Sequence, residues 1–268
     1  MISDFSHKIS LGQNFLINPE VIRRCVEAGA IAPSDVLLEI GPGQGVLTRE
    51  LLKSPCALLH SVEIDHRLAP WLTPLQTDFP DRFRLTWSDV MKLDLSALSP
   101  RPTKVLANIP YNITSDVIWK IVGELVPAGL DRMILLIQRE AAERLAAPPG
   151  TRQRYPLGVT LEALSSIRTV MKVSPGSFSP PPKVWSSLIS IHFERNRSLA
   201  ADPLWRRLLF SAFRQRRKKM IGNLAGEGWD RQALIELFDS LGIQETARAE
   251  ELTMPQWLSL YASLQGRS

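Results

Sequence analysis

Short apolar runs alternate with amphipathic segments through the first two thirds of the chain. The runs predict strands at residues 36–40, 58–64, 83–87, 104–107, 132–137, 170–173 and 187–193, the first of which is expected to be buried. Apolar positions at helical spacing lie between several of them and predict helices, at residues 19–29, 46–53, 115–126 and 138–147. Strands that alternate with helices predict an α/β fold built on one open sheet of seven strands.

The pattern changes after about residue 194, where no strand-like run remains. The remaining apolar stripes predict helices at residues 205–224, 231–241 and 255–264. We therefore predict an α/β domain over residues 1–197 and a small all-helical domain over residues 198–268. A length of 268 residues is enough for two domains of modest size.

Composition is typical of a soluble globular protein, with 44% apolar and 22% charged residues. No apolar run approaches the roughly 20 residues of a membrane span, and residues 1–10 lack the apolar core of a signal peptide. Cys25 and Cys56 lie among apolar neighbours without a CxxC spacing, which indicates core positions in a reducing compartment. The histidines show no metal-ligand spacing. We expect a cytoplasmic protein that needs no metal.

Basic residues gather in one segment of the predicted helical domain. Residues 203–226 contain no acid and seven basic residues: Arg206, Arg207, Arg214, Arg216, Arg217, Lys218 and Lys219. A solvated helix face and a surface that contacts nucleic-acid phosphates both explain this distribution. The net charge of +5 is modest, so charge alone leaves both interpretations open.

A glycine-rich turn follows the first predicted strand, in the sequence Glu39-Ile-Gly41-Pro-Gly43-Gln-Gly45. A strand, a glycine turn and a helix open the nucleotide-binding α/β unit, because the backbone there can approach a ligand closely. The dinucleotide fingerprint would have glycine at residue 46, where this chain has valine. The E-x-G-x-G-x-G spacing is instead typical of S-adenosylmethionine enzymes. Ordinary loop geometry remains an alternative for the turn taken alone.

Acidic residues stand at the ends of the next two predicted strands. Glu63 falls about 20 residues after the glycine turn, where an acid accepts hydrogen bonds from the ribose hydroxyls of a bound nucleoside. Asp89 follows the third strand and is placed to accept a hydrogen bond from an adenine amino group, with a turn residue as the alternative. Asp65 is expected to cap the following helix.

The fourth predicted strand ends in Asn108-Ile-Pro110-Tyr111-Asn. Ligands bind at the carboxyl ends of strands in an open α/β sheet, and Asn/Asp-x-Pro-Tyr/Phe is the arrangement used to methylate an exocyclic amine of a base. Asn108 supplies an amide, Pro110 stiffens the turn, and Tyr111 supplies a flat face. A proline-rich loop at residues 175–183 presents a further aromatic, Phe178, which we expect to be exposed.

Six motifs in one order resemble the ribosomal RNA adenine dimethylases of the KsgA/RsmA type. They are Leu-Gly-Gln-Asn-Phe-Leu at 11–16, Glu-Ile-Gly-Pro-Gly at 39–43, Val-Glu-Ile-Asp at 62–65, Asn-Ile-Pro-Tyr-Asn at 108–112, Phe-Ser-Pro-Pro-Pro-Lys-Val at 178–184 and Ala-Phe-Arg-Gln-Arg-Arg-Lys at 212–218. The resemblance covers nearly the whole chain. It implies a Rossmann-like class I methyltransferase domain with a mostly parallel sheet, followed by a small helical domain.

The resemblance also implies a reaction and a partner. S-adenosyl-L-methionine would donate methyl groups to N6 of two adjacent adenosines in the loop of the hairpin near the 3′ end of 16S rRNA. The partner would be the precursor of the small ribosomal subunit, with phosphates contacted by a basic helix at residues 203–222. We expect the enzyme to be a monomer.

Site residues carry over from the resemblance position by position. The methionyl end of the cofactor would meet Asn14, Leu16 and Gly41. Its ribose would meet Glu63, its adenine would meet Asp89, and Asn108 would lie beside the sulfonium.

For the reaction, we hypothesise that the Asn108 side-chain oxygen and the Pro110 carbonyl hydrogen-bond the target amine. Tyr111 and Phe178 would stack on the two faces of the base. Pro156 and Trp185 depart from residues common in the family, so local RNA contacts there stay open.

Two other functions remain to be weighed. A DNA adenine methyltransferase would use similar chemistry, although the chain has no target-recognition domain. A non-catalytic assembly or transcription factor would keep the fold, although Glu63 and the motif at residues 108–111 are intact.

Overall fold

The computed structural model describes residues 13–266 and divides them into two compact units. The first contains residues 13–142 and 166–194, and the second contains residues 143–165 and 195–266. Residues 11 and 12 of the first sequence motif lie outside the described residues. The domain boundary after residue 197 stays a prediction, and no separate unit was expected for residues 143–165.

A seven-stranded sheet forms the centre of the first unit, in the order β4-β3-β2-β5-β6-β9-β7 among the described residues. Its strands are β2 (Val36–Ile40), β3 (Leu58–Glu63), β4 (Phe83–Trp87), β5 (Lys104–Asn108), β6 (Arg132–Gln138), β7 (Ser165–Val173) and β9 (Ser186–Phe193). β2 to β6 pair in parallel, and β9 is antiparallel to β6. The predicted α/β fold with a mostly parallel sheet is confirmed.

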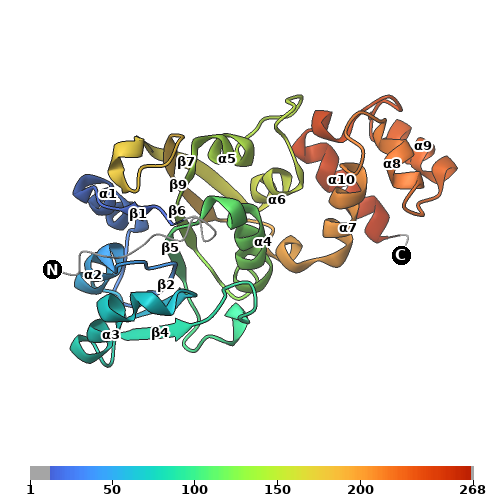
Figure 1. The fold of residues 1–268 in the computed structure, drawn as a ribbon. Coiled ribbons are helices and arrows are strands. Elements are labelled where there is room, and N and C mark those ends of the chain that lie inside the picture. The colour runs from blue at the N-terminus through green and yellow to red at the C-terminus, as the bar shows by residue number, and fades with distance from the viewer. Residues whose placement is uncertain (1–12, 267–268) are drawn as a thin grey trace. The chain divides into compact units, whose positions relative to one another are not determined.

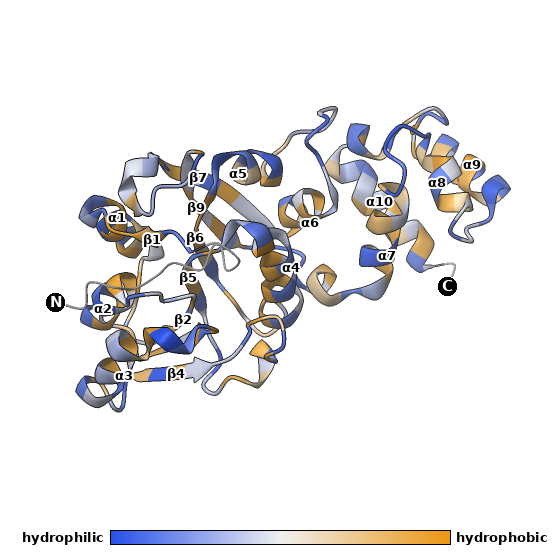
Figure 2. Ribbon diagram, in the orientation of Figure 1, coloured by the Kyte–Doolittle hydropathy of each residue, from blue (hydrophilic) through white to orange (hydrophobic). Residues whose placement is uncertain are grey.

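Four helices of the first unit cover the sheet, namely α1 (Pro19–Gly29), α2 (Val46–Lys53), α3 (Ala69–Asp78) and α4 (Thr114–Leu125). Figure 1 shows α1, α2 and α3 on one side of the sheet and α4 on the other. The Asn18 side chain accepts a hydrogen bond from the Glu20 N–H at 3.0 Å and caps α1, as its sequence predicts. Apolar residues are concentrated along the central strands (Figure 2), where Leu37, Val105 and Leu135 are fully buried.

A small second sheet connects a strand near the start of the first unit with a strand near its end in the sequence. β1 (Phe15–Leu16) pairs antiparallel with β8 (Phe178–Ser179), and Leu16 lies opposite Phe178. Phe178 is only 2% exposed and belongs to the hydrophobic core, so the expectation that it is exposed was wrong. The reason is its pairing with a segment more than a hundred residues away, which local sequence cannot reveal.

The second unit, in the residues that the structure describes, consists mainly of helices joined by turns. They are α6 (Pro156–Leu164), α7 (Pro203–Ala212), α8 (Met220–Ala225), α9 (Arg231–Ser240) and α10 (Met254–Gln265), while α5 (Arg139–Leu145) spans the division at residue 142. The sequence prediction missed α6, because most of its residues are buried and it lacks the periodicity of a surface helix. Trp205 of α7 donates its indole N–H to Thr160 of α6 at 3.1 Å.

The single helix predicted over residues 205–224, and with it a basic helix over residues 203–222, was wrong. α7 ends at Ala212 and α8 begins at Met220. Residues 214–219, Arg-Gln-Arg-Arg-Lys-Lys, are all exposed and form turns, which we call the basic turn. Six polar residues in succession offer no apolar face to hold a helix against a core.

Within residues 13–266, no helix has both the length and the apolar content needed to cross a membrane.

Candidate functional site

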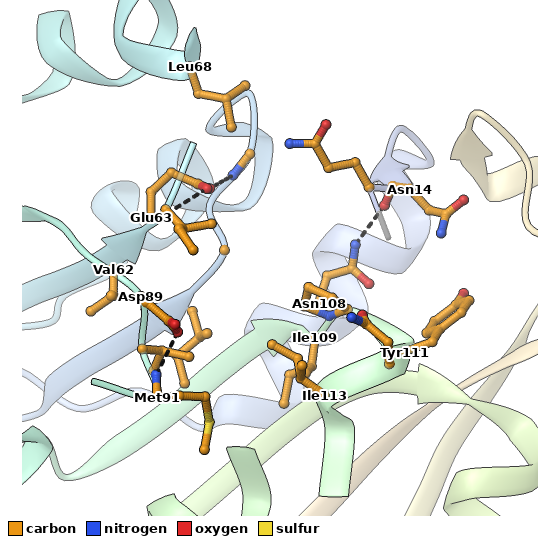
Figure 3. A pocket seen from close by; sticks show the side chains of 18 of the residues that line it. Asn14, Val62, Glu63, Leu68, Asp89, Met91, Asn108, Ile109, Tyr111 and Ile113 are labelled. Atoms are coloured by element: carbon orange, nitrogen blue, oxygen red, sulfur yellow. Dashed lines mark hydrogen bonds between the residues drawn. The ribbon is translucent and has the colours of Figure 1, made fainter. Parts of the chain in front are cut away.

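The main cavity of the first unit lies at the carboxyl ends of the parallel strands. β2 pairs with β3 on one side and β5 on the other, so the chain order reverses at β2 and leaves a crevice there. The cavity has a volume of about 230 Å³ and is lined by residues from the turns after these strands. Figure 3 shows Glu63 and Asp89 on one side of it and Asn108 and Tyr111 on the other.

Glu63 holds a carboxylate in a fixed position at the end of β3. One oxygen accepts the Gly43 N–H at 3.2 Å, and the other accepts the N–H groups of Ile64 and Asp65 at 2.9 Å each. Burial raises the pKa of Glu63, and these three backbone hydrogen bonds oppose that change. The carboxylate is therefore rigid, and with three of its roughly four acceptor positions occupied it retains one for a hydroxyl donor.

Asp65, two residues later, has a different role. It accepts from the backbone N–H of Arg67 at 3.2 Å and pairs with the Arg67 guanidinium at 2.6 Å, which lowers the Asp65 pKa to about 2. It also accepts the Gln13 side-chain N–H at 2.8 Å. The predicted cap at Asp65 is confirmed. Its side chain also holds Gln13, which lines the cavity.

Asp89 lies at the opposite end of this wall, after β4. One of its carboxylate oxygens accepts the Met91 N–H at 2.9 Å, as a turn residue does, and the other has no hydrogen-bond partner among residues 13–266. Ile64 and Met91 are 48% and 38% exposed and also line the cavity. Exposed apolar side chains beside an unpaired acceptor suit a flat aromatic ring with an amino group.

The glycine turn lets an aromatic ring lie directly on the backbone. Gly43 has a φ of +58°, and a Cβ there would lie 2.7 Å from the Phe15 ring. Gly41 has a φ of +69° and lies near the Asn108 carbonyl. Glycine is therefore required at 43 both by conformation and by space.

Glu39, which precedes the turn, is 1% exposed and accepts hydrogen bonds from Thr48 and Ser61 at 2.8 Å each. Burial raises the pKa of Glu39 to about 7. Glu39 is one of the residues that line a smaller recess next to the main cavity, together with Leu16 and Gly41.

Asn108 ends β5 with its side chain in the cavity (Figure 3). Its amide nitrogen donates to the Asn14 carbonyl at 2.9 Å, although the two residues are 94 positions apart. That hydrogen bond fixes the orientation of the amide, and its oxygen accepts no hydrogen bond within the described part of the chain. The cavity thus contains a preorganised amide oxygen.

The Pro110 carbonyl points toward the start of α4. It accepts the Ile113 N–H at 3.2 Å and the Thr114 hydroxyl at 3.2 Å. The role predicted for this carbonyl stays a prediction, and it requires release of one of these hydrogen bonds. Tyr111 lines the cavity, and its hydroxyl lies 2.7 Å from the Ser186 hydroxyl.

The structure brings together six of the predicted site residues besides Pro110, namely Asn14, Gly41, Glu63, Asp89, Asn108 and Tyr111. Leu16 lines only the smaller recess, and Phe178 lines neither cavity. A stacking role for Phe178 would need its buried ring to be uncovered.

Sequence reasoning missed Phe15, Ile64, Met91 and Ser186. Of these four residues, Ile64 had a local signal in the sequence, namely an apolar side chain directly after the acid that ends β3.

The basic turn of the second unit contains both partnered and exposed cations. Arg216 donates to the carbonyls of Arg152 and Arg154, and Arg214 pairs with Glu227. Arg217, Lys218 and Lys219 are exposed and make no side-chain hydrogen bond or ion pair within residues 13–266. Contact of this turn with phosphate stays a prediction, and it now concerns these three residues.

Comparison with known proteins gives a consistent result. The family model described as ribosomal RNA adenine dimethylase matches residues 4–266. A protein of Acidobacterium capsulatum named ribosomal RNA small subunit methyltransferase A is 35% identical over 98% of this chain and 93% of its own length. A protein of the same name from Synechococcus sp. is 38% identical over 95% of this chain and 94% of its own.

Solved structures show the same fold. A dimethyladenosine transferase from Plasmodium falciparum has a TM-score of 0.81 and 23% identity, over 94% of this chain and 98% of its own. The 23S rRNA methyltransferase ErmE has a TM-score of 0.70 and 24% identity, over 94% of this chain and 100% of its own.

Proposed function

This chain belongs to the ribosomal RNA adenine dimethylase family, and from that premise we propose its substrate and cofactor. It would transfer methyl groups from S-adenosyl-L-methionine to N6 of two adjacent adenosines, two methyl groups to each. These adenosines would lie in the loop of the hairpin near the 3′ end of 16S rRNA, in the precursor of the small ribosomal subunit. The observation that carries the proposal is the fixed Asn108 amide oxygen in the cavity.

The residues present fit the cofactor. The Glu63 carboxylate, held by three backbone N–H groups, would accept both ribose hydroxyls, one at its remaining acceptor position and one at an oxygen shared with a backbone N–H. The unpaired oxygen of Asp89 would accept the adenine amino group, and Ile64 and Met91 would contact the ring. The methionyl end would lie toward Asn14 and Gly41. When bound, S-adenosyl-L-methionine supplies a methyl group that is already activated by its positive sulfur.

The protein's own contribution is alignment and electrostatics. The lone pair of an adenine amino group is delocalised into the ring, so the nitrogen is a weak nucleophile. An N–H donated to the Asn108 oxygen would hold that nitrogen in line and would favour the positive charge that develops on it. Since the oxygen is already oriented by Asn14, little reorganisation is needed at the moment of transfer.

Asn108→Ala tests this proposal. It should abolish single-turnover methylation of small-subunit particles that lack the modification, while S-adenosylhomocysteine binding in calorimetry changes less than about threefold. Mass spectrometry of the RNA would locate the methyl groups. Near-normal transfer by the variant would refute the role of Asn108, and transfer to DNA but not to RNA would favour the DNA methyltransferase alternative.

A further inference from the structure

Ser186 is a buried hydroxyl that the proposed reaction does not use. It is the first residue of β9 and lies opposite Gln138 of β6 in the antiparallel pair. Its side chain is fully buried. The strand pairing holds its backbone in place at the edge of the sheet where the parallel strands end.

Tyr111 is the partner of this hydroxyl, with 2.7 Å between the two oxygens. Tyr111 itself belongs to a short 3₁₀ turn, Tyr111–Ile113, between β5 and α4. Its ring lines the cavity, and its hydroxyl end points away from the Glu63 side (Figure 3). The backbone holds one end of this side chain and Ser186 holds the other.

Two anchors at opposite ends restrict rotation of an aromatic ring. A stacking surface is effective only when its plane is fixed before the ligand arrives, because ordering a mobile side chain costs binding free energy. Burial also raises the pKa of the Tyr111 hydroxyl, so this group stays a neutral donor and acceptor. Removing its buried partner would leave a polar group unsatisfied and favour a different ring position.

We propose that Ser186 is a positioning residue that holds the Tyr111 ring as the stacking surface for the target adenine. This inference rests on the proposed function, since the adenine is the substrate assigned there. Ser186 does not touch the substrate in this proposal and acts only through Tyr111.

A double-mutant cycle tests the coupling between the two residues. Ser186→Ala and Tyr111→Phe each remove one partner of the hydrogen bond, and Ser187→Ala is the matched control. Ser187 is also buried, and as the next residue of the strand it faces the other side of the sheet. We expect kcat/KM for RNA to fall on the order of tenfold in each single variant. We expect no further fall in the double variant and little change in the control.

Two binding measurements accompany the rates. S-adenosylhomocysteine affinity should stay within about threefold of wild type in Ser186→Ala, because the cofactor end of the cavity is untouched. An RNA hairpin with 2-aminopurine at the target position should show weaker quenching with Ser186→Ala than with wild type or the control. Additive losses in the double variant, or equal quenching in all three proteins, would overturn the proposal.

A structural readout separates this inference from the proposed function. The chain has three tyrosines, so ring-labelled tyrosine gives three NMR signals, and Tyr111→Phe identifies the one from residue 111. Ser186→Ala should shift that signal alone, and an unchanged signal would refute the anchoring. If wild-type protein methylates no RNA, the proposed function fails while this spectrum still decides the contact. If Ser186→Ala folds poorly, Tyr111→Phe removes the same hydrogen bond at a half-buried side chain, and it should show the same fall in kcat/KM and the same weaker quenching.

Discussion

Glu63→Gln is the sharpest test of the cofactor site, because it changes one acceptor atom into a donor and leaves the side-chain volume almost unchanged. In the wild type, both carboxylate oxygens accept backbone N–H groups. Glutamine must therefore turn its NH₂ group toward an N–H donor in either orientation. The less costly orientation keeps the oxygen on Ile64 and Asp65 and places the NH₂ against Gly43.

The magnitude follows from the acceptors that are lost. In the mutant, one of the two ribose hydroxyls would no longer find an acceptor. A hydrogen bond to a charged group is worth about 1.5–3 kcal/mol, and 1.4 kcal/mol corresponds to a factor of ten. We therefore expect the Kd for S-adenosylhomocysteine to rise roughly 10- to 150-fold in Glu63→Gln.

Isothermal titration calorimetry with two ligands isolates this contact. The 2′,3′-dideoxy analogue of S-adenosylhomocysteine lacks the hydroxyls, so wild-type protein should lose affinity for it by a similar factor. In Glu63→Gln, the affinities for the two ligands should differ much less, because the contact with the hydroxyl is already broken. A Kd within threefold of wild type, or an equal loss between ligands in both proteins, would refute this assignment of Glu63. Thermal unfolding without ligand reports any change in the free protein.

Three further predictions concern the turn, a buried acid and the basic turn. Gly43→Ala should lower stability by about 1–3 kcal/mol in thermal unfolding, since its φ is +58° and its Cβ would lie 2.7 Å from a ring; Gly176→Ala, where a Cβ meets nothing within 4 Å, should not. Burial raises the pKa of Glu39 from 4.5 to about 7. The favourable contribution of this residue to the free energy of unfolding is therefore complete below pH 4.5 and is lost as the pH rises through 7. In urea unfolding, the free energy of unfolding of Glu39→Gln relative to wild type should rise on the order of 3 kcal/mol from pH 4.5 to pH 8. A difference that does not change with pH would contradict this. Replacing Arg217, Lys218 and Lys219 of the basic turn by glutamine should reduce the slope of log K against log salt for RNA binding by roughly 2–3, and an unchanged slope would indicate a solvated surface.

Local sequence was sufficient for the elements and for several of their ends. The strands at residues 36–40 and 83–87 have the predicted bounds. The first is a mostly apolar run that is buried along its whole length, whereas the second alternates apolar and polar residues and buries only Phe83 fully. The caps at Asn18 and Asp65 also follow from the chain itself, since a cap joins residues two or three positions apart. The alternation of these elements determined the α/β fold.

Apolar periodicity failed where burial did not depend on one face of a helix. It missed α6, which has almost no exposed face, and it continued a helix through the basic turn, which has no buried face. Apolar periodicity arises because one face of a helix is buried and the opposite face is exposed to solvent. A segment that is buried on all sides or exposed on all sides therefore shows no such periodicity.

The sequence by itself predicted which residues belong to the site, but not the contacts that hold them in place. Tertiary structure alone decided that the Asn14 carbonyl orients Asn108, that Ser186 holds Tyr111, and that Phe178 is buried opposite Leu16. These partners are separated by 75 to more than 150 positions, and nothing in their local sequence selects them. Strand order brings Asn108 to the edge of the sheet where the parallel strands end, and the antiparallel β9 places its first residue, Ser186, at that same edge. Pairing of β1 with β8 in a separate small sheet buries Phe178.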